Sequence, residues 1–128
     1  MKARKITFLV HTVVAAVTGA PLLLAPGRFL GWIGWAPVDP ILSRLLGAAL
    51  LALAWSSFRG WRAADEAQTT ILLELETAFA VLGCVGLLRH LLTSRYPAMV
   101  WITFVVLAAF AVAWIAFLAT GRRSQQAG

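Results

Sequence analysis

The chain has 128 residues, of which 61% are hydrophobic and only 12% are charged, against about 45–50% and about 25% in a typical soluble domain. A water-soluble protein of this length could not bury so much apolar surface. The net charge of +6 comes from single basic residues or pairs at the ends of apolar runs, which is typical of membrane anchoring and excludes a phosphate-binding stripe for nucleic acid.

Four apolar runs cover residues 6–25, 41–58, 71–92 and 98–119, each close to the about 20 residues that cross a hydrocarbon core. They predict an all-α fold, an antiparallel four-helix transmembrane bundle in a single domain over 1–128, with a short interfacial segment after the first helix. The first run begins like a signal peptide but lacks a small-x-small cleavage site, so we interpret it as a retained helix.

The distribution of basic residues between the two sides predicts the orientation in the cell membrane. The N-terminus, the second connection and the C-terminus share one side, and the other two connections share the opposite side. The first side holds Lys2, Arg4, Lys5, Arg59, Arg62, Arg122 and Arg123; the second holds Arg28, Arg44, Arg89 and Arg95. The positive-inside bias therefore predicts a multi-pass protein with both termini in the cytoplasm.

The first connection is too short to span a membrane and too apolar for open water. We expect a break in the first helix near Pro21 and an interfacial segment that holds Trp32 and Trp35 at headgroup level. Asp39 and Pro40 predict the start of the second helix, with Asp39 as N-cap and Pro40 at the first helical position.

Small residues mark the second run, where Gly47 and its neighbouring alanines predict close helix packing. Asp65, three residues before Gln68, predicts a cap that starts the third helix before its apolar run. In the last run, Trp101 and Trp114 lie about 20 Å apart along a helix, a spacing typical of two interfacial aromatic belts. Gly121 predicts the end of that helix and a disordered tail.

The segment 21–62 resembles known membrane proteins. It contains Pro26-Gly27-Arg28-Phe29-Leu30, a Gly-Trp, Asp39-Pro40, and a helix that begins Ser43-Arg44-Leu45-Leu46-Gly47-Ala48. In this it is similar to small uncharacterised four-helix prokaryotic membrane proteins of the domain-of-unknown-function type. The resemblance implies a four-helix architecture and carries no functional residues.

Two carboxylates, Glu74 and Glu76, lie inside the third run, and ionisable groups at membrane depth are functional-site candidates. Residues two apart on a helix are rotated by about 200°, so the two side chains point to opposite faces. Small residues on the Glu76 face favour it as the face that contacts another helix. His11 and Glu76 both lie about 7.5 Å inside the cytoplasmic edge, so a contact between them is allowed. The sequence therefore predicts a polar cluster at the cytoplasmic end, made of His11, Ser56, Ser57, Arg59, Arg62, Glu74 and Glu76.

Three interpretations of this cluster stay open. In the first, Glu74 or Glu76 pairs with Arg59 or Arg62 and holds two helices in register. In the second, the cluster lines a cytoplasmic vestibule in which a glutamate binds a proton or cation. In the third, Glu74 reaches into the interface. For His11, an interhelical hydrogen bond is favoured over metal ligation, because no second ligand lies at helical spacing.

A second cluster at the outer end combines Asp39, Arg44, Arg89 and His90 near one level. Arg44 is expected to pair with Asp39, a backbone carbonyl or a lipid phosphate. The excess of positive charge makes an anionic headgroup or anionic solute an alternative ligand for this cluster.

No other motif carries chemistry. The sequence has no phosphate-binding glycine loop and no zinc motif, and no Ser, His and acid arrangement is expected on one side of the membrane. We therefore expect a non-enzymatic protein without cofactor or metal, which binds lipid or other membrane subunits in an accessory or structural role. The alternative function is a proton-coupled or passive transporter of a small solute that acts as a homo-oligomer.

Overall fold

The computed structural model describes the backbone of residues 2–35, 38–93 and 95–126, and the side chains up to residue 121 within those ranges. The described residues form five helices: α1 (Lys2–Leu24), α2 (Pro26–Trp32), α3 (Pro40–Arg62), α4 (Glu66–Leu91) and α5 (Ala98–Gln126). All except the short α2 are long and apolar enough to cross a membrane. The predicted all-helical fold with four long apolar helices is confirmed at this level.

Local sequence signals set the starts of the two middle helices. The Asp39 carboxylate accepts hydrogen bonds from the backbone N–H groups of Ile41 and Leu42, at 2.9 and 3.0 Å, and Pro40 opens α3. The Asp65 carboxylate accepts from the N–H groups of Ala67 and Gln68. Both predicted caps are confirmed, and α4 begins before its apolar run because Asp65 satisfies its first free N–H groups.

Two boundaries differ from expectation. The helix α1 continues through Pro21 to Leu24, because a proline removes one backbone hydrogen bond without ending a helix whose neighbours support it. The helix α5 continues past Gly121 to Gln126, so the prediction of a helix end at Gly121 with a disordered tail was wrong. Glycine lowers helix propensity by about 1 kcal/mol, and that penalty did not stop the helix.

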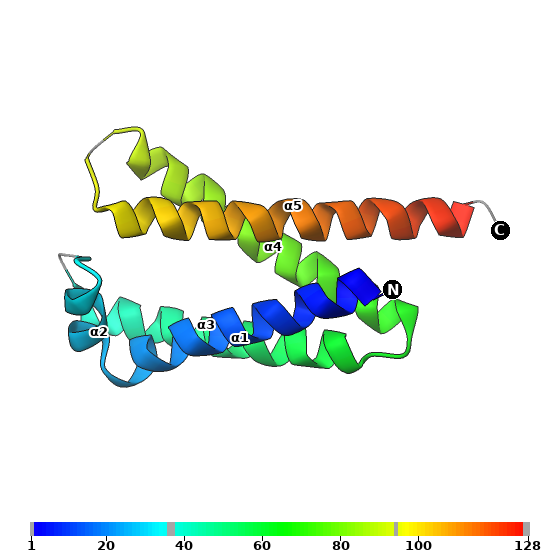
Figure 1. Ribbon diagram of the computed structural model, residues 1–128, viewed down its shortest axis with the longest axis horizontal. Coiled ribbons are helices and arrows are strands. Elements are labelled where there is room, and N and C mark those ends of the chain that lie inside the picture. The colour runs from blue at the N-terminus through cyan, green and yellow to red at the C-terminus, as the bar shows by residue number, and fades with distance from the viewer. Residues whose placement is uncertain (1, 36–37, 94, 127–128) are drawn as a thin grey trace.

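The helices α1 and α3 lie side by side and share the largest interface, while α5 packs mainly on α4. Figure 1 shows the α1 and α3 pair along one side of the molecule, α5 along the other, and α4 running obliquely between them. The short helix α2 follows α1 and contacts both α1 and α3. At the end of the molecule opposite α2, the carboxyl end of α3 and the beginning of α4 lie close to the amino end of α1 (Figure 1).

Glycines bring the backbones of α1 and α3 into contact. A Cβ atom added at Gly47 would lie 2.5 Å from the backbone nitrogen of Leu23 and 2.8 Å from the carbonyl oxygen of Gly19. A Cβ atom at Gly19 would lie 2.9 Å from the carbonyl oxygen of Gly47. Only hydrogen fits at these two positions, so the small residues of α3 serve the close approach that the sequence pattern predicts.

Many large apolar side chains among the described residues are exposed. Val17, Leu82 and Val112, on three different helices, are 66%, 71% and 69% exposed. The buried core is small and centres on Phe8, Leu73, Ala80, Ala111 and Trp114. The described residues thus leave a large apolar side-chain surface uncovered within one copy of the chain.

Replacing Gly47 by alanine should lower the free energy of unfolding in detergent by roughly 1–3 kcal/mol, because the added methyl group overlaps the backbone of α1. Gly86 on α4 is a matched control, since a Cβ atom there meets nothing within 4 Å. Its alanine variant should be neutral or more stable by about 0.5–1 kcal/mol. Equal stabilities for the two variants, measured by denaturant titration, would contradict the packing described here.

Candidate functional site: a buried polar cluster

Three helices each contribute one polar side chain to a site inside the protein. His11 lies on the buried stripe of α1, Ser57 on that of α3, and Glu76 on that of α4. The three residues are 7%, 0% and 1% exposed. Side chains seven or eight residues apart share one helix face, and Glu76 shares its face with Thr69 and Leu73, which are also buried.

Short hydrogen bonds join these three side chains. The Ser57 hydroxyl donates to Oε1 of Glu76 at 2.8 Å, and its oxygen lies 2.7 Å from Nδ1 of His11. Because a hydroxyl has one proton, which Glu76 accepts, Nδ1 of His11 must be the donor to Ser57. The same nitrogen lies 3.2 Å from Oε2 of Glu76. The arrangement therefore assigns a proton to Nδ1. The buried carboxyl group accepts one hydrogen bond, from Ser57 on α3, and lies at ion-pair distance from His11 on α1.

Aromatic rings from α1 and α5 enclose the cluster. The His11 ring makes edge contacts with Phe110 and Trp114, with centroid distances of 4.6 and 5.8 Å. Trp114 is fully buried and its ring centroid lies 4.8 Å from that of Phe8. Trp114 is thus part of the core, and its assignment to an interfacial belt was wrong. Helical spacing alone does not distinguish an aromatic side chain that faces headgroups from one that faces another helix.

Some buried polar atoms in and near the cluster have no hydrogen-bond partner. Within the described part of the chain, Ser56 Oγ, Glu76 Oε2 and Trp114 Nε1 are buried and have no hydrogen-bond partner. Ser56 stands beside the carboxyl group of Glu76 on the same helix as Ser57. The cluster thus holds one carboxylate oxygen, one hydroxyl and one indole N–H whose hydrogen-bonding capacity is not filled.

The structure brings a Ser, a His and a Glu of the predicted cytoplasmic cluster into contact. Its geometry differs from that of a catalytic triad, in which one histidine nitrogen contacts the acid and the other contacts the serine. Here Nδ1 of His11 faces both partners, and the serine proton is given to the glutamate. This geometry links α1, α3 and α4 through contacts between their polar side chains.

The remaining residues predicted for the cytoplasmic cluster lie outside it. Glu74 is exposed on the opposite side of α4, and Arg59 and Arg62 are exposed at the end of α3. Glu76 is bound by His11 and Ser57 in place of an arginine, so the interpretation that pairs Glu76 with Arg59 or Arg62 was wrong. An arginine at a helix end reaches the surface more easily than it reaches a buried carboxylate.

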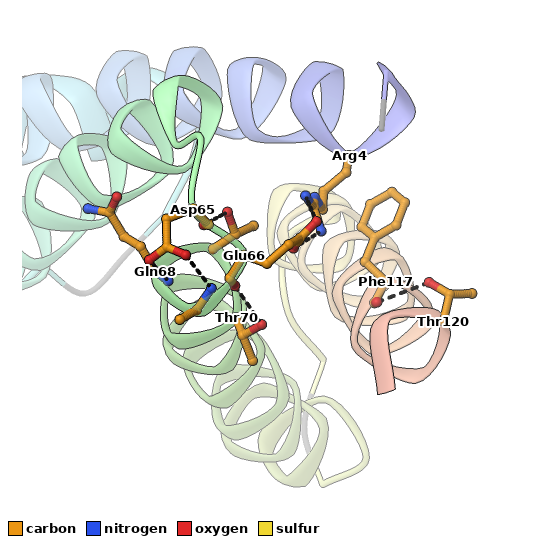
Figure 2. A network of polar contacts seen from close by, with 9 residues as sticks. Arg4, Asp65, Glu66, Gln68, Thr70, Phe117 and Thr120 are labelled. Atoms are coloured by element: carbon orange, nitrogen blue, oxygen red, sulfur yellow. Dashed lines mark hydrogen bonds and ion pairs between the residues drawn. The ribbon is translucent and has the colours of Figure 1, made fainter. Parts of the chain in front are cut away.

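A polar network at the surface connects the amino ends of α1 and α4. Arg4 makes a two-pronged ion pair with Glu66, with N to O distances of 2.9 and 2.8 Å, beside the Asp65 cap of α4. Figure 2 shows this network, with Arg4 reaching from α1 to Glu66. Sequence reasoning missed the pair. Its signal was a basic residue before the first apolar run and an acidic one before the third, on the same predicted side.

The residues of the predicted outer cluster are dispersed. Asp39 is occupied as the cap of α3, and Arg44, Arg89 and His90 are exposed. Figure 1 shows the start of α3, which carries Arg44, and the end of α4, which carries Arg89, well separated at that end of the molecule. The expected pair of Asp39 with Arg44 is not among the ion pairs of the described residues. The prediction placed these residues together because they lie at similar depths along their helices. Similar depth does not determine how far apart two helices are.

Comparisons of the chain with protein-family models, with curated proteins and with solved structures find no match. Among the residues that the structure describes, no group of three or more His, Cys, Asp and Glu side chains could hold a metal ion. The site must therefore be interpreted from its own geometry.

Replacing Glu76 by glutamine should lower the free energy of unfolding by about 1–3 kcal/mol. The amide keeps the shape of the carboxyl group and its oxygen can still accept from Ser57. Its NH2 group then replaces Oε2, 3.2 Å from Nδ1 of His11, so that two donors face each other in a buried site. The matched control is Glu74→Gln on the same helix, where the side chain is exposed and the loss should be much smaller. Unfolding of purified protein in detergent measures both, and a larger loss in the Glu74 variant would contradict the assignment of the site.

Proposed function

We propose that this chain is an antiparallel four-helix transmembrane bundle of the cell membrane, with both termini in the cytoplasm and α2 at the opposite interface. It acts by packing and binding, to lipid or to other membrane subunits, in a non-enzymatic accessory or structural role. The observation that carries this proposal is that the one buried carboxyl group, among the described residues, is engaged by side chains of two other helices.

Burial of the cluster supports a structural role. A carboxylate without partners would cost several kcal/mol to bury, and helices in lipid have little hydrophobic drive to associate. Hydrogen bonds among His11, Ser57 and Glu76 therefore both relieve that cost and hold α1, α3 and α4 together. The exposed apolar side chains of the four long helices supply the surface that contacts lipid or another subunit.

The orientation rests on the distribution of basic residues. Arg4, Arg59 and Arg62 lie at the end of the molecule where α1 begins and α3 ends, and the positive-inside bias favours the cytoplasm for that end. The resemblance of segment 21–62 to small four-helix membrane proteins agrees with the proposed four-span architecture.

A second candidate function is proton-coupled or passive transport of a small solute by a homo-oligomer. The observation that favours it is the set of buried atoms without partners, Glu76 Oε2, Ser56 Oγ and Trp114 Nε1. A carboxyl group with an unused oxygen at membrane depth is the kind of group that carries protons in transporters. Four helices enclose little space, so a solute pathway would require more than one copy.

Reconstitution into liposomes distinguishes the two functions. With a pH-sensitive dye inside and an imposed proton gradient, the purified protein should give no proton flux above that of empty liposomes, because the Glu76 side chain is only 1% exposed. Glu76→Gln and Glu74→Gln proteins should give the same background. Proton flux in the wild type that is lost in the Glu76 variant and kept in the Glu74 variant would reject the structural role and establish transport.

A further inference from the structure

A pocket lies where α3 ends and the chain turns into α4. Its volume is about 330 Å³, and it is lined by Trp55, Phe58, Arg59, Arg62, Ala63, Ala64 and Gln68. This volume is at the small end of the range for ligand pockets, about 300–1,000 Å³. The pocket therefore fits a compact chemical group and not an entire lipid or peptide.

The lining combines an aromatic wall with hydrogen-bond donors. The rings of Trp55 and Phe58 lie 5.8 Å apart, and the Arg62 guanidinium stands 5.8 Å from the centre of the Phe58 ring. An arginine held over an aromatic ring is partly ordered before any ligand binds. Arg59 and the Gln68 amide add further donors to the same space.

The positive charge of the pocket is not neutralised by the neighbouring acids. The Asp65 carboxylate accepts from the backbone N–H groups of Ala67 and Gln68, and Glu66 is held in its ion pair with Arg4. Figure 2 shows the Gln68 side chain directed away from that ion pair. In the described part of the chain, neither Arg59 nor Arg62 forms an ion pair. Among the described residues, the two guanidinium groups of the pocket thus have no counter-ion.

We propose that this pocket binds a phosphate group, presented either by an anionic phospholipid or by a free phosphate. Guanidinium groups match the oxygens of phosphate in a two-pronged geometry. This inference rests on the proposed function, because the membrane placement proposed above puts the end of α3 at the cytoplasmic interface, where anionic headgroups gather. Trp55 lines the pocket on the side away from the end of α3 and is 63% exposed, so it can also contact the acyl chain of a bound lipid.

The site lies at the opposite end of the molecule from the anion contact that the sequence suggested. Arg44 and Arg89 are separated on different helices, whereas Arg59 and Arg62 are one helical turn apart and share a pocket. These two pairs offer a matched comparison, because each double substitution to glutamine removes two positive charges from exposed positions.

The test uses the full chain purified in detergent. Native mass spectrometry counts the lipids retained after adding phosphatidylglycerol or phosphatidylcholine to the wild type, to Arg59→Gln/Arg62→Gln and to Arg44→Gln/Arg89→Gln. We expect the wild type to retain phosphatidylglycerol in preference, and the Arg59/Arg62 variant to bind it about tenfold more weakly or worse, since two charged donors are lost. The Arg44/Arg89 variant should bind as the wild type does. Equal retention of the two lipids by the wild type, or an equal loss in both double variants, would overturn the proposal.

A second measurement uses proteins that keep Arg59 and Arg62, and so does not depend on whether the double variants fold. Phosphatidylglycerol with brominated chains should quench the tryptophan fluorescence of the wild type more strongly than brominated phosphatidylcholine does. Most of this difference should vanish in Trp55→Phe. A difference that persists unchanged in Trp55→Phe would place the bound lipid elsewhere and overturn the site.

Inorganic phosphate distinguishes the two sources of the group. If phosphate alone raises the melting temperature of the wild type and displaces phosphatidylglycerol, the pocket accepts free phosphate. If bound phosphatidylglycerol resists excess phosphate, the lipid is the ligand. The proton-flux experiment tests the proposed function separately. If the protein shows no preference for phosphatidylglycerol, the phosphate site is wrong, but the result of the proton-flux experiment still stands. If the protein prefers phosphatidylglycerol and also transports protons, only the structural role is rejected.

Discussion

The buried carboxyl group of Glu76 is the constraint on which the arrangement of the helices depends. A group of this kind must find hydrogen-bond donors inside the protein, and the donors come from α1 and α3. The positions of three helices are thereby coupled at one level. Around that level, Phe8 and Trp114 form the fully buried aromatic layer, and towards the α2 end the contact between Gly19 and Gly47 sets the approach of α1 to α3.

Much of the architecture could be predicted because its signals are local. Length and composition predict four long apolar helices, and single carboxylates at Asp39 and Asp65 set the starts of two of them through hydrogen bonds to nearby N–H groups. The constant rise of a helix, about 1.5 Å per residue, places His11 and Glu76 at the same depth. The structure brings these two side chains to within 3.2 Å.

What sequence reasoning missed depends on lateral position, which depth and helical period do not give. Ser57 was predicted in the cytoplasmic cluster, but its place as the link between His11 and Glu76 depends on how α3 packs against α1 and α4 at that level. Trp114 could have faced lipid or protein at the same spacing, and the structure buries it. The pocket at the end of α3 depends on the turn into α4, whose path the residue pattern does not specify.

The central claim is that His11 and Glu76 stabilise the fold by acting on each other. A double-mutant cycle measures this directly, with His11→Ala, Glu76→Ala and the double variant unfolded reversibly in detergent or bicelles. The structure predicts a coupling free energy of about 0.5–3 kcal/mol, the range for side chains in direct contact. Losses in unfolding free energy that simply add would show that the two side chains do not interact and would contradict the account.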